Sequence, residues 1–231
     1  FIKFLGLTLQ QTAAMLVETL RVPVLGHASR VRVVVGGLLS IIPFVNFVAW
    51  GYLYRVFIDG LNGTPSLVLP SWGEWRAYWS VGLRLFVITL GYLVLIAFAG
   101  VAVLTIFASG SFDDPQKILT IGLLSLAAFN ILSPVVYARY AEERRIWAAF
   151  EPDVLYRDLR RIVRIDYVQL CLLYLGIWMM TFLILVGIPY LGPVVLSVVH
   201  FYLSLVFAFV FGRIVGGRRL PSESPSLVDP N

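Results

Sequence analysis

The chain has 231 residues, of which 59% are hydrophobic and only 13% charged, and its mean hydropathy is +0.87. A soluble domain of this size carries about a quarter charged residues, so the composition excludes a soluble enzyme or regulatory domain. The formal net charge of +5 does not indicate a nucleic-acid partner, because the basic residues flank apolar segments, where an anionic lipid leaflet explains them.

The N-terminal region is predicted to lie on the membrane surface. We expect residues 1–27 to form this interfacial segment, because residues 1–20 are apolar but interrupted by polar residues. The residues expected to face lipid are Phe4, Leu5, Leu7, Met15 and Leu16. We expect this segment to belong to a single integral membrane domain over residues 1–219. Residues 220–231 are rich in Pro and Ser, and we expect a disordered tail there.

The apolar segment Val31–Ile58 allows two interpretations, because Pro43 and Asn46 lie at its centre. It is either one kinked span, Val33–Tyr54, or a hairpin whose second helix covers Phe44–Leu61. Only the hairpin places nearly all the basic residues on one side of the membrane. The positive-inside rule therefore favours the hairpin.

A weak internal repeat supports the hairpin. Residues 42–48 (IPFVNFV) parallel residues 188–194 (IPYLGPV). Each contains an Ile-Pro step and two apolar residues, then Asn46 or Gly192, residue types that tolerate a tight turn. The predicted architecture is an all-α, polytopic transmembrane helical bundle of three hairpins, with five to six membrane segments.

Four further segments each have about the twenty apolar residues needed to span a membrane. They are Tyr78–Phe107, Ile118–Tyr137, Val168–Ile188 and Val194–Val215. With the hairpin in place, only Lys117 lies on the side opposite the other basic residues. We therefore expect both termini in the cytoplasm and a location in the inner (cytoplasmic) membrane of a prokaryote.

Two connectors between the hairpins are predicted to lie at the cytoplasmic surface as interfacial amphipathic helices. The first carries three tryptophans with helical spacing, Trp72, Trp75 and Trp79. The second carries an apolar stripe opposite four arginines, Arg157, Arg160, Arg161 and Arg164. Indole rings and arginines both favour the headgroup region, so we expect both sets to contact lipid headgroups, those of an anionic leaflet for the arginines.

The stretch Val33–Ala99 resembles a prokaryotic integral membrane family catalogued as a domain of unknown function, number 4013. The residues that carry the likeness are Gly36-Gly37-Leu38-Leu39, Ile42-Pro43, Gly51-Tyr52-Leu53-Tyr54-Arg55, Gly60, Leu69-Pro70, Trp72, Trp75 and Gly82. The resemblance implies a polytopic helical membrane protein. It implies no activity and no site residues.

Polar residues inside the apolar segments are the candidates for a functional site. Asn46, Asn130 and Ser133 form a possible intramembrane polar site, although a turn at Asn46, and an interhelical hydrogen bond with a proline kink at Asn130, are the favoured explanations. His200 is either a hydrogen-bonded packing residue or an axial ligand for haem or a chlorophyll-type ring. We predict no other cofactor and no metal site.

No catalytic constellation is found in the sequence, and no acidic residue lies in the middle of a span, which argues against ion-coupled transport. We therefore expect an accessory or scaffold subunit of a larger membrane assembly, with lipids and other membrane subunits as partners. The alternative is a small-solute transporter or lipid-handling protein. The third hypothesis is pigment or haem binding through His200.

Overall fold

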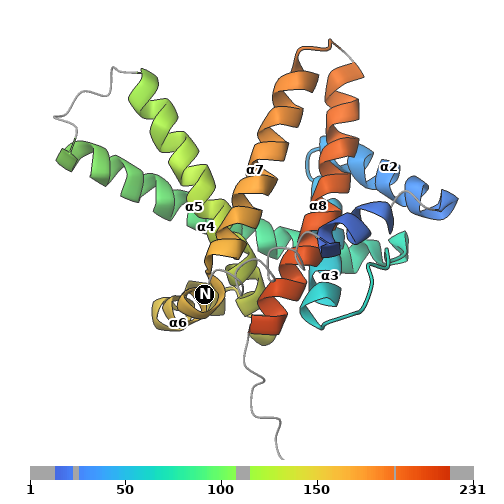
Figure 1. The fold of residues 1–231 in the computed structure, drawn as a ribbon, viewed down its shortest axis with the longest axis horizontal. Helices are drawn as coiled ribbons and strands as arrows, with labels where there is room; N and C mark the ends of the chain where they lie inside the picture. The colour runs from blue at the N-terminus through green and yellow to red at the C-terminus, as the bar shows by residue number, and fades with distance from the viewer. Residues whose placement is uncertain (1–13, 23–25, 108–114, 190, 219–231) are drawn as a thin grey trace, which may run out of the picture.

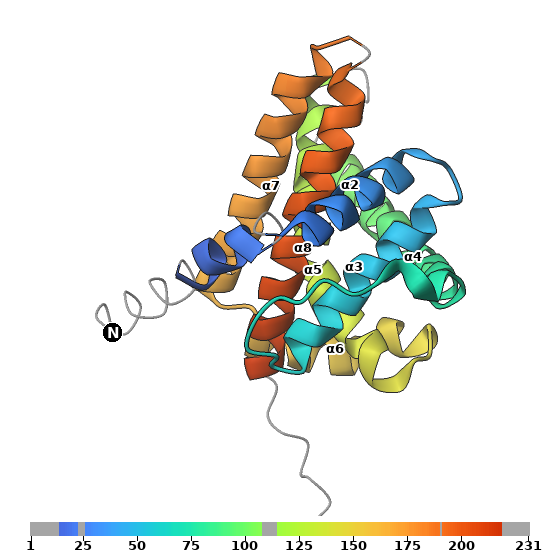
Figure 2. The same ribbon diagram turned by 90° about the vertical axis from the view of Figure 1, so that its right-hand side faces the viewer.

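The computed structural model describes residues 14–22, 26–107, 115–189 and 191–218 (Figures 1 and 2). The elements in these ranges are helices, which confirms the predicted all-α class. In order they are a helix over Ala14–Val22, α2 His27–Ile41, α3 Asn46–Leu61, η1 Trp72–Glu74, α4 Trp75–Phe107, α5 Pro115–Glu143, η2 Trp147–Phe150, α6 Pro152–Ile162, α7 Ile165–Val186 and α8 Leu191–Arg218.

The four helices α4, α5, α7 and α8 are long and apolar enough to cross a membrane. Each contains one of the four predicted spans almost completely. A fifth span results if the bent pair of helices Ala14–Val22 and α2 is counted as one. The chain is therefore an integral membrane protein.

The segment around Pro43 folds as two separate helices, as the hairpin interpretation predicts. α2 ends at Ile41 and α3 begins at Asn46. With 15 and 16 residues, these helices are about 22 and 24 Å long, which is shorter than the roughly 30 Å hydrocarbon core of a bilayer.

The two Ile-Pro steps form the same turn, which confirms the internal repeat. The Val45 N–H donates to the Pro43 carbonyl at 2.8 Å, and the Leu191 N–H donates to the Pro189 carbonyl at 2.7 Å. In each turn the next N–H donates to the carbonyl of the isoleucine that precedes the proline. The distances are 3.0 Å from Asn46 to Ile42 and 3.1 Å from Gly192 to Ile188. The second turn joins α7 to α8.

The residue that adopts the left-handed conformation in the first turn is not Asn46. Phe44 has φ +65°, whereas Asn46 is already the first residue of α3. The Val45 N–H bonds to the Pro43 carbonyl, so Phe44 is the residue at which the chain reverses its direction. The ordinary preference of Asn for positive φ is overridden by the turn geometry.

The two long hairpins diverge from a shared base (Figure 1). The α4–α5 pair extends to the left and the α7–α8 pair extends upward. α3 packs between α4 and α8 with its backbone in contact with theirs. A Cβ added at Gly51 would lie 2.0 Å from the Tyr78 carbonyl oxygen of α4, and one at Gly60 would lie 2.3 Å from the Phe209 carbonyl oxygen of α8. Glycine at these positions permits the close approach.

The N-terminal helix packs on protein rather than on lipid, which corrects the expectation for Met15 and Leu16. Both side chains contact the core cluster that contains Tyr167 of α7. The Tyr202 hydroxyl of α8 also donates to the Leu20 carbonyl at 2.6 Å. The helix packs part of its apolar side against α7 and α8, because these helices provide an apolar surface to bury it against. Phe4, Leu5 and Leu7 lie outside the described residues.

Candidate functional site

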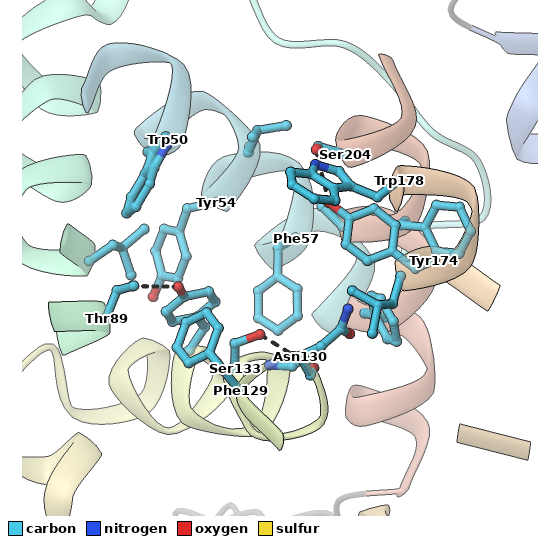
Figure 3. A pocket seen from close by; sticks show the side chains of 18 of the residues that line it. Trp50, Tyr54, Phe57, Thr89, Phe129, Asn130, Ser133, Tyr174, Trp178 and Ser204 are labelled. Carbon is cyan, nitrogen blue, oxygen red and sulfur yellow. Dashed lines mark hydrogen bonds between the residues drawn. The ribbon is translucent and has the colours of Figure 1, made fainter. Parts of the chain in front are cut away.

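A cavity of about 360 Å³ lies where five helices meet, between the two long hairpins (Figure 3). It falls within the size range of about 300–1,000 Å³ that is usual for small-molecule sites. Its walls are mainly apolar and aromatic. They comprise Trp50, Leu53, Tyr54 and Phe57 of α3, Leu85 and Thr89 of α4, Leu126, Phe129, Asn130, Ser133, Pro134 and Tyr137 of α5, Tyr174, Leu175 and Trp178 of α7, and His200, Ser204, Phe207, Ala208 and Phe211 of α8.

Three of the residues singled out in the sequence line this cavity together. Asn130 and Ser133 lie one turn apart on α5, and His200 belongs to the part of the wall that α8 contributes. Asn46 lies elsewhere, at the start of α3, where its Oδ1 atom is buried and has no hydrogen-bond partner among the described residues. The predicted polar set is therefore one site without Asn46.

Most polar side chains in the wall are already hydrogen-bonded to one another. Thr89 and Tyr137 join their hydroxyl groups at 2.7 Å, and Tyr174 and Ser204 join theirs at 3.1 Å (Figure 3). The Ser133 hydroxyl donates to the backbone carbonyl of Asn130 at 3.4 Å. Within the described part of the chain, no hydrogen bond to the Asn130 carboxamide is found, so this group is available to a ligand.

His200 is held by a neighbouring tryptophan. The Trp178 indole N–H donates to His200 Nε2 at 2.9 Å, and the two rings meet edge to face at 5.3 Å. Because Nε2 accepts this bond, the imidazole is neutral and carries its proton on Nδ1. Haem or chlorophyll ligation through Nε2 would require this bond to break. No group of three or more His, Cys, Asp or Glu side chains that could hold a metal is found in the ranges described.

The aromatic wall on α3 was not predicted. Trp50, Tyr54 and Phe57 occupy positions i, i+4 and i+7, so they share one face of the helix, and that face lines the cavity. This spacing was a signal in the sequence. It was uninformative alone, because an apolar stripe on a membrane helix faces either lipid or protein.

The expected headgroup residues lie in different surroundings. Trp75 and Trp79 are both 43% exposed, but Trp72 stacks on Tyr52 with ring centroids 4.0 Å apart. The four arginines of the second connector, Arg157, Arg160, Arg161 and Arg164, are exposed. The apolar side of α6 packs on the bundle through Ile162.

The comparison with protein families gives a match. A family model described as "Protein of unknown function (DUF4013)" matches residues 35–190, which include the first Ile-Pro turn and the Ile188-Pro189 step that begins the second, and which extend well beyond the stretch that carries the sequence resemblance. Neither the curated proteins nor the solved structures contain a match to the chain.

Proposed function

We propose that the chain, which belongs to this family of proteins of unknown function, is a lipid-handling membrane protein. It binds a mainly apolar, membrane-resident molecule in the cavity between its hairpins. The observation that carries this proposal is the cavity itself, which has Asn130, Ser133 and His200 in its mainly apolar and aromatic walls. A tightly packed bundle would have no room for such a ligand.

The hydrogen bonds of the wall define the chemistry of the ligand. The Thr89, Tyr174 and Trp178 side chains are satisfied within the protein, so a ligand with many polar groups would find few partners and would lose its hydration. The Asn130 carboxamide offers both donors and an acceptor. The ligand class that fits is a hydrocarbon chain or ring with a single hydroxyl or carbonyl group.

The orientation of the protein is part of this proposal. Arg139, Arg218 and α6 gather at the base from which the long hairpins diverge. The positive-inside rule favours this base on the cytoplasmic side of a prokaryotic inner membrane, with both termini there. The ligand would then reach the cavity from the lipid, between the diverging hairpins.

Quenching of tryptophan fluorescence tests the proposal. Trp50 and Trp178 both line the cavity, so a brominated fatty alcohol bound there would quench them at close range. We expect saturable quenching of the protein in detergent when dibromostearyl alcohol is added. Substitution Ala208→Phe fills the cavity from the α8 side and should abolish the saturable component.

The matched control is Ala97→Phe, which adds the same ring on an exposed position of α4 away from the cavity walls. It should leave the saturable quenching intact. Quenching that rises linearly with the probe and is equal in the native protein and the Ala208→Phe variant would reflect partition into the micelle. That result would refute binding in the cavity.

A role as an accessory subunit of a larger membrane assembly is the second candidate. It is supported by the outer half of α4, where the consecutive residues Leu93, Val94 and Leu95 are all exposed. Consecutive residues on a helix point in directions 100° apart, so most of the circumference is bare and available to a partner helix. Mass spectrometry after purification in a gentle detergent should find a stoichiometric partner. A colourless sample from the same purification would exclude pigment binding at His200.

A further inference from the structure

Some charged groups at the base of the bundle are neutralised within the protein. Arg139 pairs with Glu142 at 2.9 Å, with Glu151 at 3.2 Å and also with Glu143. These contacts tie the end of α5 to the residue that precedes α6. The charge of Arg139 is therefore used to hold the connector in place.

A second internal ion pair fixes the other end of the connector. Arg218, at the end of α8, pairs with Asp166 in the first turn of α7, and both side chains are largely buried. Arg218 also donates to the carbonyl of Ile162, the last residue of α6. α6 is thus anchored at both ends, and its orientation on the bundle is fixed.

The outward side of the anchored helix carries a different kind of arginine. Arg157, Arg160 and Arg161 are exposed, and Arg164 follows just after the helix. None of them forms an ion pair with a carboxylate in the described ranges. The apolar residues Leu155, Leu159 and Ile162 occupy the opposite side and pack on the bundle. The cationic face is therefore held away from the protein by the packing of the helix.

The position of α6 along the chain puts this face at the membrane surface. α6 ends at Ile162, and the membrane-spanning helix α7 begins at Ile165, so the end of α6 lies within a few residues of the point where the chain enters the bilayer. Two exposed aromatic residues lie on the same connector, Trp147 at 80% and Tyr156 at 61% exposure. Exposed Trp and Tyr beside Arg are typical of the headgroup region.

We propose that the outward face of α6 is a binding surface for anionic phospholipid headgroups, with Arg157, Arg160 and Arg161 as its phosphate ligands and Arg164 at its membrane edge. Arginine offers a planar set of donors that matches the oxygens of a phosphate. Tyr156 supports the surface, since the Arg160 guanidinium lies over its ring at 5.6 Å. This surface is separate from the cavity, so it stands whether or not the cavity binds a ligand.

Native mass spectrometry of the protein in nonionic detergent tests the surface by counting bound phosphatidylglycerol and phosphatidylcholine. The native chain should retain phosphatidylglycerol in preference to phosphatidylcholine. The graded series R161Q, R160Q/R161Q and R157Q/R160Q/R161Q should lose affinity by about fivefold at each step, as expected when one basic residue near an anionic surface is removed. Because the side chains are exposed and unpaired, the variants should fold normally, and the single substitution R161Q gives a result even if the triple variant does not.

The matched control removes three exposed arginines on other elements, in the variant R21Q/R30Q/R84Q. It changes the net charge equally and should keep the preference for phosphatidylglycerol. An equal loss in this control would show that net charge alone attracts the lipid and would overturn the proposal. Displacement of the lipid by an equal concentration of inorganic phosphate would also overturn it, because the surface would then bind any phosphate.

Discussion

The crossing of α3 and α4 should tolerate no side chain at Gly51. A Cβ at this position would lie 2.0 Å from the carbonyl oxygen and 2.5 Å from the carbonyl carbon of Tyr78, whereas ordinary contacts begin near 3.4 Å. These atoms belong to the backbone of a helix, so they cannot rotate away. Substitution Gly51→Ala therefore requires the two helices to separate by more than an ångström.

The expected cost follows from two opposing effects. Overpacking a close contact costs about 1–3 kcal/mol, and a backbone clash belongs at the upper end of that range. Alanine returns about 0.5–1 kcal/mol through its better helix propensity. We therefore expect Gly51→Ala to lower the free energy of unfolding by about 2 kcal/mol, measured by SDS titration in mixed micelles.

Two other helical glycines provide matched controls. Neither Gly122 nor Gly176 has a neighbour within 4 Å of an added Cβ, so Gly122→Ala and Gly176→Ala should gain about 0.5–1 kcal/mol. Gly82→Ala should behave like Gly51→Ala, because its Cβ would lie 1.9 Å from the Phe47 carbonyl oxygen at the same crossing. The double variant should lose less than the sum, since the first substitution already separates the helices. Equal stabilities of Gly51→Ala and Gly122→Ala would refute the close crossing.

Three further predictions concern single contacts. Asp166→Asn should lower the free energy of unfolding by about 3 kcal/mol, because it leaves Arg218 largely buried without its carboxylate; a double-mutant cycle with Arg218→Gln measures the coupling. Trp178→Phe should cost about 1 kcal/mol in the same SDS titration, since the ring stays but the donor to His200 is lost, and no loss would refute that bond. Phe44→Gly should raise the free energy of unfolding by up to about 1 kcal/mol, because glycine adopts φ +65° without strain; a clear loss would show that the left-handed conformation is not retained.

The spans were predictable because each is a local property of the sequence. About twenty apolar residues in a row have no alternative to a helix in hydrocarbon, where every backbone group must be bonded internally. The ends were less certain. α4 begins at Trp75 rather than Tyr78, and α5 continues to Glu143 beyond the predicted Tyr137, because a helix extends into the interface as long as its polar residues remain solvated there.

The cavity was only partly predictable, because it depends on contacts between distant segments. Asn130, Ser133 and His200 stood out as polar residues in apolar helices. Nothing local paired His200 with Trp178, which lies 22 positions earlier on the other helix of its hairpin. The burial of Trp72 against Tyr52 was hidden for the same reason, since a Trp beside a membrane span usually indicates the headgroup region.

The two Ile-Pro hairpins have similar turns, but the two turns lie at different heights along α8. Their turns are 146 residues apart, from Pro43 to Pro189. Contacts between α3 and α8 join residues that are further apart in the chain, from 149 positions for Gly60 with Phe209 to 155 positions for Leu61 with Gly216. The difference of three to nine residues displaces α3 along α8 by about 5–14 Å. Figure 2 agrees, since the turn between α2 and α3 lies below the tip of the α7–α8 hairpin.

This displacement predicts where the first turn ends in the bilayer. If the tip of α7–α8 lies at the far surface, the α2–α3 turn is about 9 Å short of it and remains inside a hydrocarbon core of roughly 30 Å. In a Cys171→Ala background, Phe44→Cys should therefore resist a membrane-impermeant maleimide applied to either side, although Phe44 is 75% exposed on the protein. Ile188→Cys, at the equivalent turn, should react from the far side only. Rapid labelling of Phe44→Cys from that side would mean that the short hairpin crosses completely, and the displacement would then have to be absorbed by a tilt of α8.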